Sequence, residues 1–491
     1  MHSYNLNMVI LPIGSFMYNS KIKYGILSLF MFITILGNAQ NNVWDLKRAI
    51  DYAIEKNIQV KINDLQVVNA ENSLTQSWSA IAPTVNGSAN HVYNIGRRID
   101  PFTNTFANSS VRSNNFNLNA NLNLFSGLTT LYTIQQNRAN VLASQFDNEK
   151  LRNDVAVNVA TAFLQVLFAQ EQLRNAQNQL DVTTQQVSRN QLLFDAGTLA
   201  KGALLDLQAQ QANEELNVIV AQNTYDLALL SLVQLLNLPA EETKGFTVVG
   251  PVIDDKIEVL TDSVPNDIYQ DAAGSRPEIK AADFRIKTSR YALSVARGSY
   301  YPSISFFGSV GTGFSQLQRD VTGYTSSVQQ IAVTQAGEPV FTVIQTPITS
   351  PTTFGNQLNN NFNRAFGFNM NIPIFNSLQA RNSVWRAKVN LETAKLNMEQ
   401  TELTLRRGIE QAYYDARAAY KKYMASQKSL ESAKLAFQFS TDRFDAGMLN
   451  SVDYSTAKTR VTLAESNLLQ AKYDYLFKSK LLNFYRGKPL Y

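Results

Sequence analysis

The chain has 491 residues, of which 17% are charged and 45% hydrophobic, and its net charge is +5. It contains no cysteine, which excludes disulfides, thiolate metal sites, cysteine nucleophiles and a lipid anchor on an N-terminal cysteine. The two histidines, His2 and His91, are far apart, which argues against a histidine metal site. Basic and acidic residues are interspersed along the predicted helices, which indicates solvated faces and no nucleic-acid surface.

Residues 1–39 have the organisation of a secretory signal peptide. Two lysines precede a mainly apolar run, 24–36, and small residues around Ala39 follow it. We expect cleavage after Ala39, with translation starting at Met1 or at Met17. The apolar run is shorter than the ~20 residues that span a bilayer, so an uncleaved membrane anchor is the weaker alternative.

Residues 40–239 form the first predicted structural unit. Phe116–Phe125 alternates between apolar residues and asparagine, which predicts a strand with one apolar and one polar face. Leu128–Ala196 contains neither glycine nor proline, and a helix of that length would extend for about 100 Å. In chain order we expect a helix over 42–79, a strand over 84–94, a polar loop over 95–115 and a strand over 116–125. A long helix over 128–196, a turn over 194–199 and a helix over 201–238 follow.

Residues 240–263 are predicted to be a polar connector, and residues 264–491 repeat the first unit. The first strands of the two units are offset by 219 residues and the second strands by 250. The second unit therefore has 31 extra residues, and they fall in the loop between its strands. One unit has been duplicated. In the second copy we expect a helix over 264–299, a strand over 303–313, a polar loop over 314–362 and a strand over 366–375. A long helix over 378–446, a turn and a final helix follow.

The same sequence, Phe-Asp-Ala-Gly, ends both long helices, at 194–197 and 444–447. It predicts a helix C-terminal cap in which glycine adopts a positive φ. Apolar residues such as Val155, Val159 and Ile409 recur along the long helices at steps of four and three residues. An average spacing near 3.5 residues predicts coiled-coil packing.

Two strand pairs in one chain give four amphipathic strands, which are too few to close a barrel. Strands of this length, apolar on one side and polar on the other, are typical of transmembrane strands, and a bilayer does not tolerate unpaired edges. Three chains would supply twelve strands around a water-filled bore; a soluble antiparallel sheet packed on the helices is the alternative. The asparagines expected to face the lumen are Asn117, Asn119, Asn121, Asn123, Asn369 and Asn371.

The pattern resembles the TolC family of outer-membrane efflux proteins. The resemblance rests on the duplication, the strand pair, the motif Arg276-Pro277-Glu278, and the turns that contain Gly197 and Gly447. It implies a mixed α/β membrane protein in which long antiparallel helical hairpins form a tunnel in the periplasm. Four transmembrane strands per chain would form, in a homotrimer, a twelve-stranded β-barrel in the outer membrane among its lipids, and the loop 314–362 would be extracellular.

The resemblance also implies that the two turns form the periplasmic entrance, where the adaptor protein of an inner-membrane pump docks. The residues expected at this tip are Asp195, Gly197, Thr198, Leu199, Asp445, Gly447, Met448 and Leu449.

Asp453 lies six residues after Gly447, where the family places an aspartate that points to the pore axis. Three such carboxylates would form a ring that attracts cations. The alternative is an acidic residue in the first turn of a helix, where the helix dipole favours it. Well-studied members hold the tip closed with Tyr, Arg and Asp side chains; the matching positions here are Phe444, Leu449 and Ala203, so closure would depend on other contacts.

The sequence contains no phosphate-binding loop, nucleophile elbow or cluster of metal ligands at useful spacing. The glycines of 308–313 follow a strand but precede a polar loop, so they are assigned to the strand. We therefore expect neither catalysis nor a cofactor. The favoured function is a passive exit duct for small molecules in a tripartite efflux or secretion system. A periplasmic coiled-coil scaffold or adaptor with a small β-domain is the alternative.

Overall fold

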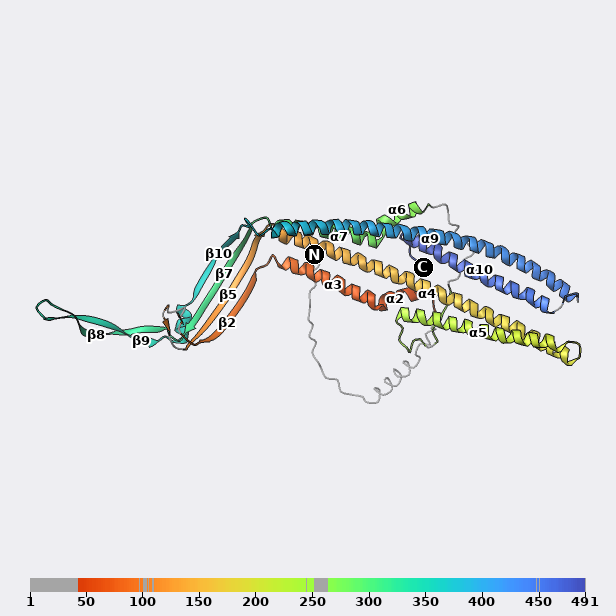
Figure 1. The fold of residues 1–491 in the computed structure, drawn as a ribbon, viewed down its shortest axis with the longest axis horizontal. Helices are drawn as coiled ribbons and strands as arrows, with labels where there is room; N and C mark the ends of the chain where they lie inside the picture. The colour runs from red at the N-terminus through yellow and green to blue at the C-terminus, as the bar shows by residue number, and fades with distance from the viewer. Residues whose placement is uncertain are drawn as a thin grey trace, which may run out of the picture.

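The computed structural model describes residues 43–490, except 97, 100–103, 105, 108–109, 244, 251–263, 447 and 450. The molecule is elongated: a β-sheet forms one end, long helices form the other, and a β-hairpin extends beyond the sheet (Figure 1). The predicted signal peptide lies outside the described residues.

The helical part consists of two similar sets of helices. In each set, one long helix is accompanied by an earlier helix and by the helix that follows the turn, placed end to end beside it (Figure 1). The first set contains α2 (Leu46–Lys56), α3 (Ile58–Ser79), α4 (Thr129–Asp195) and α5 (Lys201–Leu236). The second contains α6 (Pro265–Ser275), α7 (Pro277–Gly298), α9 (Gln379–Asp445) and α10 (Ser451–Tyr485). α4 also packs against α7 and α10, which joins the two sets.

The long helices α4 and α9 have 67 residues each, which corresponds to about 100 Å of helix. The predicted coiled-coil seam is buried in both. Val159 and Val166 of α4, and Ile409 and Ala416 of α9, have no exposed surface. A seam of valine, isoleucine and alanine lets neighbouring helices approach closely along their length.

The passage from strand to long helix is the same in both repeats. Gly127 and Leu128 have left-handed φ values of 62° and 64°, and Ser377 and Leu378 have values of 51° and 63°. A Cβ atom at Gly127 would lie 2.3 Å from the carbonyl oxygen of Gly298, so the backbone approaches too closely there for any other residue.

Two helices that the sequence predicts as continuous are each divided. The helix expected over 42–79 breaks at Asn57, whose ψ is 124° and whose side chain accepts hydrogen bonds from the N–H groups of Gln59 and Val60. The helix expected over 264–299 breaks at Arg276, whose ψ is 132°. Pro277 disfavours helical geometry in the residue before it, which accounts for the second break.

The four strands of the main sheet are β2 (Thr84–Asn94), β5 (Val111–Ser126), β7 (Ser303–Ser315) and β10 (Asn363–Asn371). The prediction of β2 is confirmed. β5 and β7 extend beyond the predicted 116–125 and 303–313, because both continue to pair with each other. β10 starts earlier than predicted and ends at Asn371 instead of 375, where Pro373 has no N–H to donate.

Two segments predicted as loop or connector contain further structure. Residues 314–362 form the hairpin of β8 (Arg319–Val333) and β9 (Pro339–Pro351) and the short helix α8 (Phe354–Asn360). Their frequent β-branched residues pair across the hairpin, with register shifts between Val321 and Gly323 and between Gln330 and Ala332. In the polar region 95–115, β3 (Arg98–Ile99) pairs with β4 (Phe106–Ala107).

The connector also contains β6 (Thr247–Val248), which pairs in parallel with β1 (Val43–Trp44). Trp44, Phe246 and Val248 are buried there against α4 and α5. This contact attaches the described start of the chain and the connector to the middle of the helical part.

Candidate functional site

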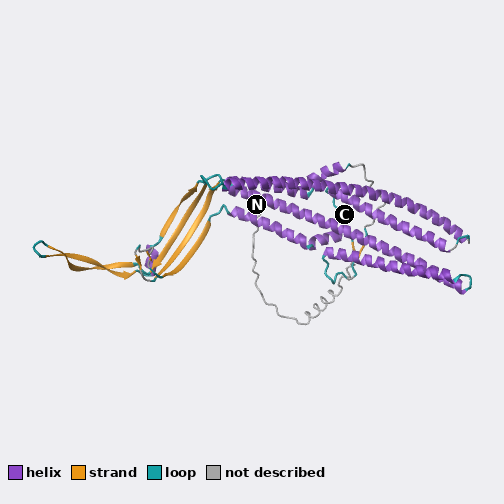
Figure 2. Cartoon of the chain, in the orientation of Figure 1, coloured by secondary structure: helices purple, strands orange, loops and turns teal. Residues whose placement is uncertain are grey.

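The sheet has the strand order β10-β7-β5-β2, with antiparallel pairs throughout. β10 and β2 therefore form its two edges, and neither pairs with a second strand among the described residues. The long helices lie beyond the end of the sheet and leave its faces uncovered (Figure 2). A soluble sheet of this kind would need cover on its apolar face, so the uncovered faces argue against that alternative.

The register places the six predicted asparagines on one face of the sheet. Asn117 lies opposite Ser88 on β2 and Gly311 on β7. Asn369 and Asn123 both lie opposite Ser305 of β7. Alternation along β5 and β10 assigns the others to the same face: Asn119, Asn121 and Asn371. That this polar face lines a lumen remains a prediction.

One aromatic residue interrupts the polar face. Phe307 lies between Asn121 and Gly367 in the register. Its ring is 3.1 Å from the position that a Cβ atom of Gly367 would occupy, so the glycine makes room for the ring. The alternation rule applied to β5 did not reveal this exception, because Phe307 stands in a strand without strict alternation.

The opposite face of the sheet is apolar. Phe306 and Phe368 face each other across β7 and β10, with ring centroids 5.4 Å apart. Leu118 and Val310 form a similar cross-strand pair. Phe368 is 71% exposed in the single chain. Apolar side chains exposed over most of a sheet face are expected where lipid is the surrounding solvent.

The turn between α4 and α5 has the predicted capping geometry. Gly197 has a φ of +75°. The N–H and the hydroxyl of Thr198 both donate to the carbonyl oxygen of Leu193, at 2.9 and 2.8 Å. The Asp195 carboxylate accepts a hydrogen bond from Gln191 at 2.9 Å. Asp195, Gly197 and Thr198 are exposed, whereas Leu199 is half-buried.

The turn between α9 and α10 repeats this arrangement. The N–H of Met448 donates to the carbonyl oxygen of Arg443 at 2.8 Å, as Thr198 does to Leu193. Met448 is exposed and Leu449 is half-buried. Gly447 and the side chain of Asp445 lie outside the described part of the chain. Both turns therefore present short, exposed loops at the far end of the helices from the sheet (Figure 1).

Asp453 occupies the first turn of α10, and its side chain is exposed. This position satisfies the helix-dipole alternative. Whether the carboxylate also points to a pore axis remains a prediction, because a single chain does not define such an axis.

A cluster near the tips was not predicted from the sequence. The rings of Phe444 and Tyr454 stack across the turn, with centroids 4.6 Å apart and an interplanar angle of 24°. The guanidinium of Arg189, on α4, lies 5.6 Å from the centroid of the Phe444 ring. These three residues, called the tip cluster below, connect α4 to the hairpin of α9 and α10. In the sequence, the tip cluster is indicated only by an aromatic residue on each side of the turn, at 444 and 454.

The motif Arg276-Pro277-Glu278 has a structural role in this chain. The buried guanidinium of Arg276 contacts Glu278 at 3.2 Å and donates to the carbonyl oxygen of Phe484 at 3.4 Å. It also lies over the Phe484 ring, 4.8 Å from the centroid. The break between α6 and α7 is thereby fixed to the end of α10. Among the described residues no cluster of three or more His, Cys, Asp or Glu side chains could hold a metal ion.

Comparisons with known proteins agree with this architecture. The sequence profile of the family described as outer membrane efflux protein matches residues 49–238 and 268–487. The chain is 20% identical over 355 residues to the alkaline protease secretion protein AprF of Pseudomonas aeruginosa. This alignment covers 71% of this chain and 65% of AprF. It is 22% identical over 453 residues to the outer membrane protein TolC of Vibrio cholerae, which covers 90% of each protein.

The fold is similar to that of the Campylobacter jejuni CmeC outer membrane channel, with a TM-score of 0.69 and 18% identity. That comparison covers 90% of this chain and 84% of CmeC. The profile match spans both copies of the duplicated unit, and members of this family are channel proteins. The chain therefore belongs to the outer membrane efflux protein family and is a TolC-type efflux channel of the outer membrane.

Proposed function

We propose that three copies of the chain assemble into one passive conduit that crosses the outer membrane and continues into the periplasm. The observation that carries this proposal is the open sheet. Among the described residues, its edges β2 and β10 pair with no second strand, and its faces are uncovered except where the short helix α8 packs against β7. Three sheets joined edge to edge give twelve strands, which close into a barrel and satisfy every edge. The asparagine face then lines the bore and the phenylalanine face contacts lipid.

The exposed surface of α5 supports assembly in the helical part as well. By length and composition this helix could cross a bilayer, but it packs along α4 in the helical part, away from the sheet. Its exposed apolar side chains recur at three- and four-residue steps on one side. They are Leu205, Leu216, Ile219, Val220, Leu227 and Leu230. A stripe of this kind in an aqueous compartment is stabilised by contact with a neighbouring copy.

The two turns are proposed as the docking surface for a periplasmic adaptor protein that connects the conduit to an inner-membrane pump. Their supporting features are exposure and position, since both lie at the end of the molecule opposite the sheet. Small molecules are the proposed cargo, and the pump supplies the energy. The Asp453 carboxylates of three chains would form a cation-attracting ring just inside this entrance.

The test of assembly is the mass of the detergent-extracted mature protein, measured by light scattering with the detergent contribution removed. Three chains per particle are expected. One or two chains per particle, or a particle that stays soluble without detergent, would overturn the proposal.

A substitution pair tests the helical contact separately. Ile219→Asp places a charge in the exposed stripe of α5 and should shift the particle towards single chains. Gln222→Asp adds the same charge to an exposed position of the same helix, about 120° around the helix axis from Leu216 of the stripe, and it should leave the mass unchanged. Equal effects of the two variants would refute a specific contact through the stripe.

A further inference from the structure

The charges of the sheet are distributed unequally between its two faces. The strands β2, β5, β7 and β10 carry no acidic residue, one histidine, His91, and two arginines, Arg112 and Arg364. Arg112 pairs with Tyr93 and shares a face with Phe116, four residues further along β5. Arg364 pairs with Val310, which in turn pairs with Leu118. Both cations therefore lie on the apolar face, where lipid is the expected neighbour.

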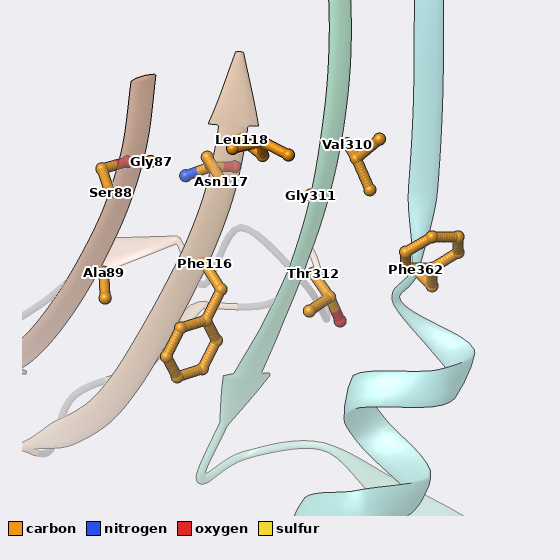
Figure 3. A pocket seen from close by; sticks show the side chains of 10 residues that line it. All are labelled: Gly87, Ser88, Ala89, Phe116, Asn117, Leu118, Val310, Gly311, Thr312 and Phe362. Carbon is orange, nitrogen blue, oxygen red and sulfur yellow. The ribbon is translucent and has the colours of Figure 1, made fainter. Parts of the chain in front are cut away.

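A shallow, open recess of about 450 Å³ lies on the same face. Small residues leave the space: Gly87 and Ala89 on β2 and Thr312 on β7. Phe116 and Phe362 stand on either side of Thr312 (Figure 3). The remaining lining residues are Ser88, Asn117, Leu118, Val310 and Gly311. Gly87 and Ala89 belong to the edge strand β2, where the proposed assembly places β10 of a neighbouring copy beside the recess.

Arg364 lies at the outer margin of this recess. It is the second residue of β10, at the end of the sheet from which the β8–β9 hairpin extends. Its guanidinium lies 5.1 Å from the ring centroid of Phe362, which lines the recess. The apolar residues Phe366, Phe368 and Met370 follow on the same face, towards the helices. The cation thus borders the apolar band, and at such a margin we expect lipid headgroups.

The recess and the cation have different consequences for lipid binding. Acyl chains are as apolar as the recess, so the recess alone accommodates a chain without distinguishing one lipid from another. A guanidinium binds phosphate oxygens through charge-assisted hydrogen bonds, and it does so most strongly when the phosphate is not shielded by a cationic headgroup.

We propose that this face binds one anionic lipid of the outer leaflet, with an acyl chain in the recess and the headgroup phosphate on Arg364. The proposal rests on the placement of the sheet in the outer membrane and goes beyond the export function. No acidic side chain on the four strands competes for the guanidinium.

The experiment is native mass spectrometry of the detergent-solubilised full-length mature protein. Phosphatidylglycerol and phosphatidylcholine with identical acyl chains are added in turn, and glycerol phosphate serves as a probe that lacks acyl chains. Retention of phosphatidylglycerol over phosphatidylcholine is expected, with no retention of glycerol phosphate. Arg364→Gln should reduce the phosphatidylglycerol preference about tenfold, the effect of losing one hydrogen bond to a charged group. Binding of glycerol phosphate equal to that of the lipid would overturn the role of the recess.

Two matched controls make the result specific. Arg112→Gln removes the other cation of the same face and should leave the preference unchanged; a loss equal to that of Arg364→Gln would show general attraction of anions and refute the site. Gly87→Leu places a side chain in the recess, and the fold tolerates it because the nearest atom to a Cβ at Gly87 is a methyl carbon of Leu118 at 3.8 Å. Gly308→Leu is the control, because it adds the same side chain to the same face outside the recess. Only Gly87→Leu should reduce retention, and equal effects would refute the proposal.

Channel conductance in planar bilayers and the particle mass are measured on the same samples. Normal values of both, together with no lipid preference, would overturn the lipid site while leaving the export function intact. Abnormal values in the unsubstituted protein would instead contradict the proposed assembly.

Discussion

The tip cluster provides the most direct prediction about opening of the periplasmic end. Arg189 on α4 contacts Phe444 at the end of α9, and Phe444 stacks on Tyr454 of α10. Any movement that separates the α4–α5 hairpin from the α9–α10 hairpin must break the Arg189–Phe444 contact. Removing it should therefore favour an open tip.

The magnitude follows from the geometry. Arg189 is exposed, and a cation–aromatic contact at an exposed site contributes about 0.5–1 kcal/mol. If three chains open together, the loss is roughly 1.5–3 kcal/mol for the assembly, which corresponds to a change of about 10- to 150-fold in the ratio of open to closed channels.

Single-channel recording in planar bilayers measures this ratio directly. Arg189→Gln and Phe444→Leu should each increase the open fraction, since the first removes the cation and the second removes the ring while keeping apolar volume. The double substitution should add little to either one, because both remove the same contact. Arg460→Gln, at an exposed position on α10, is the control for loss of charge. An equal increase with Arg460→Gln, or fully additive effects in the double variant, would refute the reasoning.

Three further predictions concern the entrance, the turn and the helical part. Asp453→Ala should weaken the block of the channel by multivalent cations, and an unchanged block would remove Asp453 from the pore. Gly197→Lys places a side chain on a left-handed residue at a cost of about 1–2 kcal/mol, and it meets no atom of the chain, so the particle mass should stay unchanged. Export should stop, because the new side chain stands on the proposed docking surface. Normal export would contradict docking at the turn. Burial raises the pKa of the Asp147 carboxyl, although the charge of Arg285 acts to lower it. At a pH above the pKa of Asp147 in the folded protein, the ionised carboxylate therefore destabilises the fold. Asp147→Asn should accordingly have a higher Tm at neutral pH, and the difference should shrink as the pH falls through that pKa; a difference that grows in acid would contradict the sign.

The regular parts of the fold were predictable from the sequence because each has a period. Alternating asparagine marked β5, and the absence of glycine and proline over 128–195 marked α4. The breaks at Asn57 and Arg276 interrupt helices without interrupting their apolar pattern, so a search for periodicity passes over them. Proline after Arg276 carried the signal for the second break, and it was assigned to a continuous helix.

The contacts between distant segments could not be predicted in the same way. β1 and β6 have two residues each, which is too short for any alternation to be recognised. Arg189 and Phe444 are separated by more than 250 residues, and their contact depends on how two hairpins lie against each other. The β8–β9 hairpin was assigned to a loop because threonine, serine and glutamine dominated its composition, although its β-branched residues favour strands.

The two repeats have long helices of equal length and differ most in the loops between their strands. α4 and α9 have the same number of residues, and each begins after a pair of left-handed residues and ends at the same capping turn. Each residue added to one long helix would shift its turn by about 1.5 Å along the helix axis relative to the other turn. Long helices of equal length therefore keep the two turns at the same depth. The 31 additional residues lie instead between β7 and β10, at the opposite end of the molecule, where the hairpin extends into open space. Equal helices and unequal outer loops are the pattern expected if both turns contact the same partner.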